Sequence, residues 1–101
     1  MPKKRIMIID DDEMSTLLSR RLHRHGYSCR SAQSVAEGLD LLRSYNPDVV
    51  ILDLMMDKVS GSAFLASSPT PTIVLSGIDD QEITEFVLKL GAKRYLTKPY
   101  N

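Results

Sequence analysis

Five short apolar runs recur along the chain, and stretches in which apolar residues follow helical spacing separate them. Such runs suit strands of a parallel sheet that is buried on both faces. One run alternates only weakly between apolar and polar residues, and we expect it to form a strand near an edge. The predicted strands are Arg5 to Ile9, Tyr27 to Ala32, Val49 to Leu52, Thr72 to Leu75 and Ala92 to Thr97. The weakly alternating run is the second of these.

The first two stretches between these runs predict amphipathic helices with clear end signals. One helix runs from Met14 to about His25, and Gly26 follows it at the position where glycine commonly ends a helix. The next opens with a capping box of Ser34 and Glu37 and stops before Pro47. Its predicted apolar face consists of Ala36, Leu39 and Leu42 and extends to Tyr45.

The remaining two stretches differ in the strength of their helical pattern. Gln81 to Leu90 predicts a helix closed by Gly91. The composition of residues 54–61 predicts a loop, after which Ser62 to Ala66 is expected to form one or two helical turns and no more. The predicted apolar face of the helix before Gly91 consists of Ile83, Phe86, Val87 and Leu90.

This alternation of strands and helices predicts an α/β fold, in which helical crossovers connect the strands of one parallel sheet. A chain of 101 residues is long enough for one small domain, residues 1–101. The 13 Lys and Arg residues balance 13 Asp and Glu residues, so the formal net charge is zero. We therefore expect no general electrostatic attraction to nucleic acid or to an anionic membrane.

Three further features point to the cytoplasm. Cys29 is the single cysteine, so the chain cannot form an internal disulfide, as is typical of proteins in a reducing compartment. We expect Cys29 to be a small packing residue within its strand. No apolar run approaches the length of a membrane span, and the N-terminus lacks the pattern of a signal peptide.

Polar side chains follow four of the predicted strands at the point where each apolar run ends. Asp10 and Asp11 follow the first strand, Asp53 the third, Ser76 the fourth and Lys98 the fifth. The carboxyl ends of parallel strands share one edge of a sheet, which is where ligands bind in open α/β folds. Carboxylates brought together there repel one another unless a cation is bound, and oxygen ligands of this kind suit Mg²⁺. The pattern therefore predicts a site for a metal and a phosphoryl group.

In this order and spacing, the chain resembles the receiver domains of two-component response regulators, the CheY-like family. The resemblance extends from Arg5 to Pro99 and depends on four marks: the acid pair, the lone Asp53, Ser76, and Lys98-Pro99. It implies a flavodoxin-like, doubly wound, five-stranded parallel sheet with strand order 2-1-3-4-5. Relative to that family, the third helix is expected to be shortened and the last helix to be missing.

The resemblance also implies a role for each matching residue. Asp53 would be the phosphoacceptor, Lys98 would pair with the phosphoryl oxygens, and Ser76 would hydrogen-bond them. The amide of Gly77 would assist, and Tyr95 would be the aromatic switch that turns inward when Ser76 moves. The implied Mg²⁺ ligands are Asp10, Asp11, Asp53 and the backbone carbonyl of Met55.

The function that the resemblance implies is a signalling switch rather than an enzyme acting on other substrates. The chain would accept a phosphoryl group from a sensor histidine kinase or a histidine phosphotransfer protein, and would catalyse only its own phosphorylation and dephosphorylation. Phosphorylation would change a surface that a downstream protein or output domain recognises. We expect no direct contact with nucleic acid or membrane.

Three departures from the family pattern qualify this interpretation. Asp57 stands where the family usually has Pro, and the segment from Gly61 to Ser76 is several residues shorter than usual. The chain also ends soon after its fifth strand, where the family has a last helix that covers one face of the sheet. A second copy of the chain, giving a homodimer, or a segment outside this sequence is expected to cover that face.

Three other functions are alternatives to a phosphorylated receiver. A pseudo-receiver would keep the fold as a phosphorylation-independent protein-interaction module, which Asp57 and the trimmed helices favour mildly. An enzyme with an aspartyl-phosphate intermediate would need a second acid where Met55 stands. A flavin-binding protein of the same topology would need a phosphate loop after the first strand, where the acids of Asp10 to Glu13 would repel phosphate.

Overall fold

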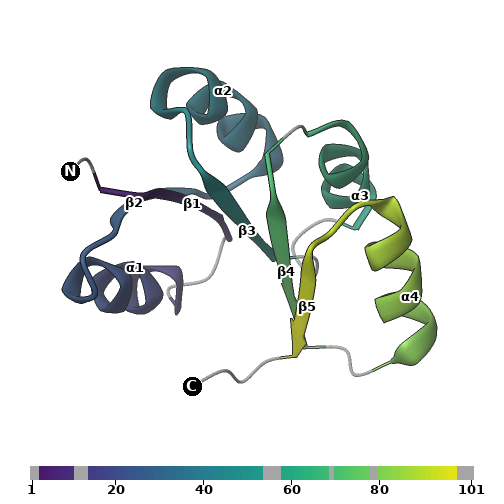
Figure 1. Ribbon diagram of the computed structural model, residues 1–101. Helices are drawn as coiled ribbons and strands as arrows, with labels where there is room; N and C mark the ends of the chain where they lie inside the picture. The colour runs from purple at the N-terminus through teal and green to yellow at the C-terminus, as the bar shows by residue number, and fades with distance from the viewer. Residues whose placement is uncertain (1–2, 11–13, 54–57, 69, 78–79, 98–101) are drawn as a thin grey trace.

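The computed structural model describes residues 3–10, 14–53, 58–68, 70–77 and 80–97, and within them strands and helices alternate along the chain (Figure 1). Apart from the third helix, the bounds agree with the sequence predictions to within two residues. The elements are β1 (Arg5–Ile9), α1 (Met14–Arg24), β2 (Ser28–Ala32), α2 (Val35–Tyr45), β3 (Val49–Asp53), α3 (Lys58–Ser67), β4 (Thr72–Ser76), α4 (Gln81–Leu90) and β5 (Arg94–Thr97).

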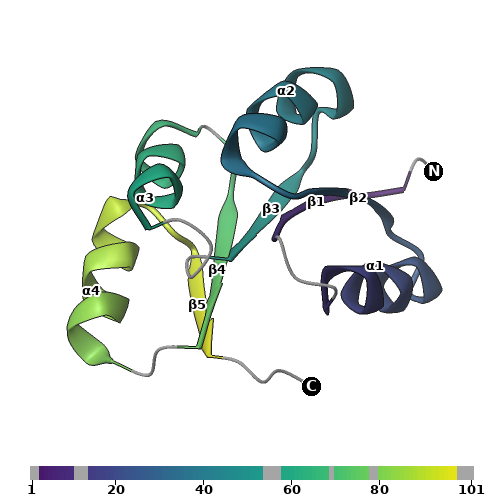
Figure 2. The same cartoon turned by 180° about the vertical axis from the view of Figure 1, so that it is seen from behind.

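The five described strands form one parallel sheet in the order β2-β1-β3-β4-β5, as predicted. Strand β1 lies inside the sheet and pairs with both β2 and β3, so the chain winds outward from it in two directions. Helix α1 lies on one side of the sheet, and α2, α3 and α4 lie on the other (Figures 1 and 2). This is the doubly wound arrangement expected of right-handed crossovers. In the part of the chain that the structure describes, no helix combines the length and apolar character needed to cross a membrane.

The side chains of each strand alternate between two apolar layers of different size. The larger layer, under α2, α3 and α4, contains Met7, Val50, Leu52 and Val74, all fully buried. The smaller layer, under α1, contains Ile6, Ile8 and Cys29, with Leu18, Leu22 and Ile51 packed against them. The two layers show that the sheet is much better covered on one side than on the other.

Cys29 is a packing residue of the smaller layer, as the sequence predicted. Its side chain is 8% exposed. Burial raises the pKa of the thiol, and a hydrogen bond with Ser19 of α1 opposes this rise only in part. A buried thiol with a raised pKa is a poor nucleophile, so Cys29 contributes to packing rather than to chemistry.

Two predictions about helix faces were wrong. Leu39 of α2 was expected on the buried face and is 43% exposed, whereas Val35 and Gly38 are the buried residues of that helix. Similarly, Phe86 of α4 is 55% exposed and Val87 is fully buried. In each helix the apolar residues span more than one face, and contact with the sheet decides which face is covered.

The third helix is also longer than predicted. Helix α3 spans 10 residues, Lys58–Ser67, and begins four residues before the expected start at Ser62. Gly61, Phe64 and Leu65 of this helix are all buried and lie at i, i+3 and i+4, so they share the face that packs on the sheet. Tertiary packing of this face therefore outweighs the weak helix propensity of the Ser and Gly residues at its start.

Gly38 lies where α2 closely approaches the sheet. A Cβ atom added there would lie 2.6 Å from Cδ1 of Ile9, a fully buried residue. Gly38→Ala is therefore expected to destabilise the domain by about 1–3 kcal/mol through overpacking, despite the better helix propensity of Ala. Ile9→Val removes the Cδ1 atom and costs about 0.5–1.5 kcal/mol alone.

A double-mutant cycle measured by urea unfolding tests this contact. The variant with both substitutions should be more stable than the sum of the two single effects predicts, by about 1 kcal/mol or more. Strict additivity of the two substitutions would contradict the proposed steric coupling between Gly38 and Ile9.

Candidate functional site

The carboxyl ends of β1, β3 and β4 bring three of the predicted site residues to one edge of the sheet. Asp10 directly follows β1, Asp53 is the last residue of β3, and Ser76 is the last residue of β4. The register pairs Ile9 with Leu52, so Asp10 and Asp53 follow at the same level on neighbouring strands. Asp53 pairs with Leu75, which places Ser76 one residue farther along β4.

All three side chains are withdrawn from solvent. Asp10 is 2% exposed, Asp53 is 5% exposed and Ser76 is fully buried. Among the described residues, only one other polar side chain, that of Thr72, is buried, and its hydroxyl donates to the carbonyl oxygen of Thr70 at 3.0 Å. Buried polar groups are therefore concentrated at this edge of the sheet, and burial of carboxylates is costly unless partners compensate it.

Two buried carboxylates at the same level on adjacent strands form a fitting donor set for a hard divalent cation. Like charges so placed repel each other, and a cation between them removes that cost. Mg²⁺ is commonly held by one or two carboxylates, with waters and a phosphate oxygen completing its coordination. Asp10 and Asp53 thus fit the predicted metal, whereas Asp11 and Met55, the other predicted ligands, lie outside the described residues.

The other predicted site residues fall into two groups. Gly77 directly follows β4, and Tyr95 lies in β5, paired in register with Val74. Since Val74 and Ser76 share one face of the sheet, Tyr95 lies on the side of Ser76, and it packs against the larger apolar layer. Lys98 lies outside the described residues, so its place at the site stays a prediction.

Sequence reasoning missed the residue that caps the helix after β4. Asp80 is the N-cap of α4, and its carboxylate accepts hydrogen bonds from the backbone N–H of Glu82 at 2.8 Å and of Ile83 at 3.5 Å. The cap fixes the start of α4 at Gln81, four residues after Gly77. The signal was present, because Asp immediately before a helical pattern is a favoured N-cap.

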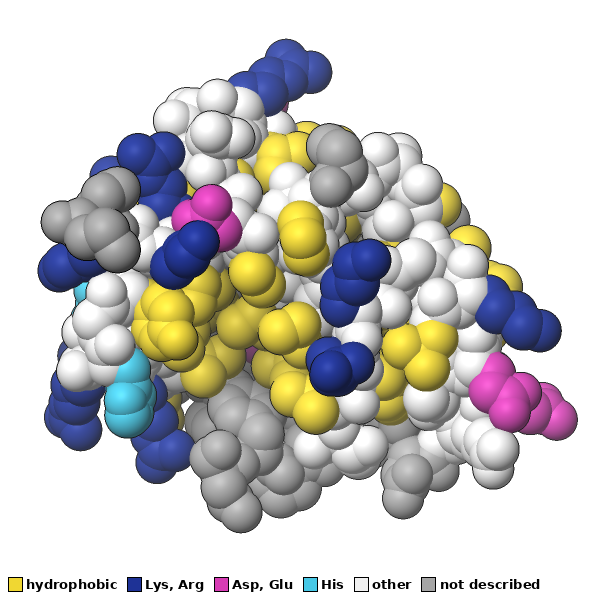
Figure 3. All heavy atoms as spheres, in the orientation of Figure 1, with side chains coloured by type: hydrophobic (Ala, Val, Ile, Leu, Met, Phe, Trp, Pro, Cys, Tyr) yellow, Lys and Arg dark blue, Asp and Glu magenta, His cyan; other side chains and the backbone are white. Residues whose placement is uncertain are grey.

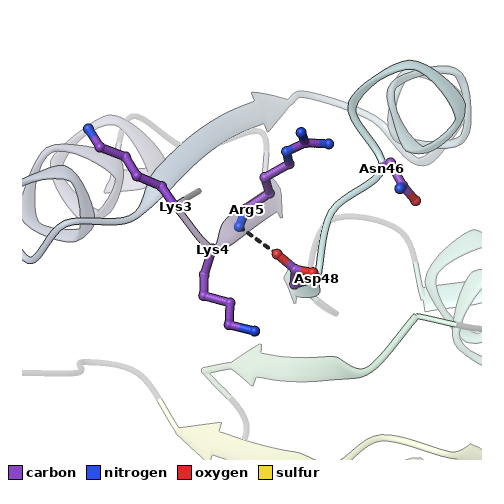
Figure 4. Close-up of a pocket in the computed structure, with 5 residues that line it drawn as sticks. All are labelled: Lys3, Lys4, Arg5, Asn46 and Asp48. Atoms are coloured by element: carbon purple, nitrogen blue, oxygen red, sulfur yellow. Dashed lines mark hydrogen bonds between the residues drawn. The ribbon is translucent and has the colours of Figure 1, made fainter. Parts of the chain in front are cut away.

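The opposite, amino-terminal edge of the sheet is organised differently. A shallow pocket there is lined by Lys3, Lys4, Arg5, Asn46 and Asp48 (Figure 4). The carboxylate of Asp48 accepts a hydrogen bond from the backbone N–H of Arg5 at 2.8 Å, and the Arg5 guanidinium donates to the carbonyl oxygen of Tyr45 at 3.1 Å. These hydrogen bonds connect β1 to the start of β3 and to the end of α2. The polar groups of this edge therefore stabilise the fold, whereas the buried acids lie at the opposite edge.

Comparisons with known proteins show the family to which the chain belongs. The family model of the response regulator receiver domain matches residues 6–101. The chain is 34% identical over 106 residues to a probable transcriptional regulator, ycf27, of Porphyridium aerugineum. This match covers all of this chain and 44% of that protein. It is 36% identical over 102 residues to the response regulator MprA of Mycolicibacterium vanbaalenii, covering 95% of this chain and 44% of that protein. The chain therefore spans less than half the length of these relatives.

A solved structure extends the likeness to three dimensions. A response regulator protein from Burkholderia pseudomallei, crystallised with a phosphorylated aspartic acid, a calcium ion and citrate, superposes with a TM-score of 0.88 at 31% sequence identity. The match covers 98% of this chain and 62% of that one. The similarity thus includes a protein in which an aspartate carries the phosphoryl group and a divalent cation is present.

Proposed function

This chain belongs to the response regulator receiver domain family of two-component systems, and we propose that residues 1–101 form a single receiver domain that Asp53 phosphorylation switches. The phosphoryl group would come from a sensor histidine kinase or a histidine phosphotransfer protein. The observation that carries the proposal is the pair of buried carboxylates, Asp10 and Asp53, on neighbouring strands beside the buried hydroxyl of Ser76. We place this activity in the cytoplasm, the compartment that the single cysteine favours.

The proposed reaction transfers a phosphoryl group onto the side chain of Asp53. A carboxylate oxygen of Asp53 attacks phosphorus, an O–P bond forms, and the N–P bond to the donor histidine breaks. The departing imidazole nitrogen keeps the electron pair and takes up a proton, and the product is an aspartyl phosphate. Such transfers depend mainly on positioning and on charge neutralisation, and the fixed place of Asp53 at the end of β3 favours the positioning.

We assign the Mg²⁺ site to Asp10 and Asp53, together with Asp11 and the backbone carbonyl of Met55. When bound, the cation offsets the negative charge that the carboxylates and the phosphoryl group bring together. Lys98 is proposed to neutralise the phosphoryl oxygens from the other side. The amide of Gly77 and the hydroxyl of Ser76 are proposed to donate hydrogen bonds to these oxygens.

The output is proposed to pass through Ser76 and Tyr95. Both lie on the same face of the sheet, and Tyr95 pairs with Val74, two residues before Ser76. A shift of Ser76 toward the phosphoryl group would open space on that face, into which Tyr95 would turn. The surface around α4 and β5 would then change, and a downstream protein or output domain would recognise it.

A pseudo-receiver is the competing candidate, favoured by Asp57 in place of the usual Pro. An added carboxylate beside the site would oppose the approach of a phosphoryl donor. Such a domain would act as a protein-interaction module without phosphorylation. The two candidates differ in a property that can be measured directly, the covalent mass of the chain after exposure to a small phosphoryl donor.

Intact-mass spectrometry after incubation with acetyl phosphate and Mg²⁺ distinguishes them. The proposed function predicts a mass gain of one phosphoryl group that is lost when EDTA replaces Mg²⁺. Circular dichroism on the same sample would establish that the chain is folded. A folded chain without any mass gain would exclude the phosphoacceptor function and leave the interaction module as the better account.

A further inference from the structure

The amino ends of β1 and β2 and the end of α1 carry a surface rich in cations. Residues 3–9 and 14–36 contain no Asp or Glu, and every Lys and Arg in these two segments is exposed. Figure 3 shows Lys, Arg and His side chains gathered on the side of α1 and the N-terminus, whereas a group of acidic side chains lies on the side of α4. The net charge of zero therefore hides a separation of charge within the domain. We call the surface made of Lys3, Lys4, Arg5, Arg24 and Arg30 the basic edge.

Backbone hydrogen bonds hold the segments of the basic edge together. The N–H of Ser28 at the start of β2 donates to the carbonyl oxygen of Lys4 at 2.9 Å. The N–H of Tyr27 donates to the carbonyl oxygen of Leu22 at 3.0 Å, which joins the last turn of α1, with Arg24, to the same strand. The cations are therefore carried by elements whose relative positions are fixed.

Tyr45 at the end of α2 brings two of the guanidinium groups together. The Arg5 guanidinium donates to the carbonyl oxygen of Tyr45 at 3.1 Å, and the Arg30 guanidinium lies 5.7 Å from the centre of the Tyr45 ring. A guanidinium has five N–H donors, so these contacts leave donors for an anionic partner. Because both side chains are already held, they lose less rotamer freedom when a partner binds.

The spread of the cations indicates the shape of the occupant. Figure 4 shows the side chains of Lys3, Lys4 and Arg5 extending in different directions rather than converging on one point. The pocket between them has a volume of about 250 Å³, below the range of about 300–1,000 Å³ that is typical of sites enclosing a small molecule. The surface therefore fits a row of separate anionic groups on an extended chain better than one compact anion.

Two residues of this pocket favour a peptide over a nucleic acid. Asn46, held in a left-handed conformation as the C-cap of α2, has a side-chain amide that can both donate and accept, as peptide groups do. Asp48 lines the same pocket and would repel a backbone that carries a phosphate at every nucleotide. An acidic peptide can place a neutral residue beside Asp48 and its carboxylates beside the cations.

We propose that the basic edge binds an extended acidic segment of another protein, in which Asp or Glu residues are separated by neutral ones. Its carboxylates would pair with the guanidinium groups of Arg5 and Arg30, which can bind a carboxylate through two hydrogen bonds, and with the ammonium groups of Lys3 and Lys4. Charge complementarity of this kind raises both the rate and the specificity of association. The basic edge lies at the opposite end of the strands from Asp53, so the proposal does not rest on phosphorylation.

A second copy of the chain is a poorer occupant of the basic edge. Asp10 and Asp53, at the other edge of the sheet, are buried, and the carboxylate of Asp80 caps α4. These acids of a neighbouring copy are therefore not free to reach the cations.

Fluorescence anisotropy in EDTA, without a phosphoryl donor, tests the proposal with three labelled probes. The first is a peptide of about 12 residues, which spans about 40 Å when extended, with Glu alternating with Gly and Ser. The second has Gln in place of Glu, and the third is a single-stranded oligonucleotide of the same net charge as the first. At low salt, the acidic peptide should bind at least about tenfold more tightly than the Gln peptide and more tightly than the oligonucleotide, and added salt should weaken its binding.

Two results with these probes would overturn the proposal. Equal binding of the Glu and Gln peptides, or no binding, would show that the basic edge does not recognise acidic side chains. Binding of the oligonucleotide as tightly as the acidic peptide, or more tightly, would assign the surface to nucleic acid instead of protein.

Variants of the protein locate the binding surface. The double variant Lys3→Glu with Lys4→Glu should weaken binding of the acidic peptide at least about tenfold. Lys89→Glu with Lys93→Glu changes the net charge equally at exposed positions near β5, and should weaken binding much less. Equal losses would mean that binding follows net charge alone and would refute the assignment to the basic edge. Sedimentation that reveals an oligomer broken by the first double variant, but not by the second, would assign the surface to another copy of this chain.

Discussion

Asp53→Asn is expected to abolish the mass gain of one phosphoryl group that acetyl phosphate and Mg²⁺ should produce in the wild-type chain. An amide nitrogen or oxygen at this position lacks the negative charge and nucleophilicity of the carboxylate, so no acyl phosphate forms.

A control from the same strand region makes the result specific. Asp48 directly precedes β3 at the opposite edge of the sheet, and an Asn there can still accept the hydrogen bond from the Arg5 N–H. Asp48→Asn should keep the full mass gain. Phosphoryl incorporation that persisted in Asp53→Asn would show that another residue is the acceptor, and peptide mapping of the modified chain would identify it.

Phe64→Ala is expected to lower the free energy of unfolding by about 3–5 kcal/mol. The side chain is 2% exposed and lies in the larger apolar layer, where it fixes α3 to the sheet. Removing it leaves a cavity that the short helix cannot fill. Because a small domain has only about 5–15 kcal/mol of stability, the variant should be partly unfolded at physiological temperature.

Urea unfolding of Phe64→Ala beside Phe86→Ala measures this effect. Phe86 is the same residue type on α4 but is 55% exposed, so its truncation should cost less than about 1 kcal/mol. Equal losses in the two variants would mean that α3 is not anchored as described. The pair also tests the assignment of helix faces, since the sequence pattern alone placed Phe86 in the core.

Element positions were largely readable from the sequence, whereas the buried faces of helices were not. Apolar runs and end signals such as Ser34 and Pro47 depend on a few neighbouring residues. The structure agrees with the second signal, since Asn46, directly before Pro47, is the left-handed C-cap of α2. The exposure of Leu39 depends instead on the approach of Gly38 to Ile9, two residues from separate elements. Local patterns cannot reveal such a contact, because α2 has apolar residues on more than one side.

The candidate site shows the same division. Buried strands that end in acids predicted that Asp10 and Asp53 would share an edge, since carboxyl ends of parallel strands meet. The pairing of Ile9 with Leu52, which sets the two acids at one level, depends on the register of strands separated by a whole helix. The extension of α3 to Lys58 likewise depends on packing of Gly61, Phe64 and Leu65 against the sheet.

The interior position of β1 has a consequence for how the site comes into being during folding. Asp10, Asp53 and Ser76 belong to three segments that lie far apart in the chain, and they meet only after β1 has paired with β3 and β3 with β4. Such non-local pairing is slow, because the chain between the strands must first be ordered. During synthesis, Asp53 would be part of the chain long before the site around it had formed. Only natively folded molecules would therefore accept a phosphoryl group. Incomplete or unfolded chains would not take part in signalling.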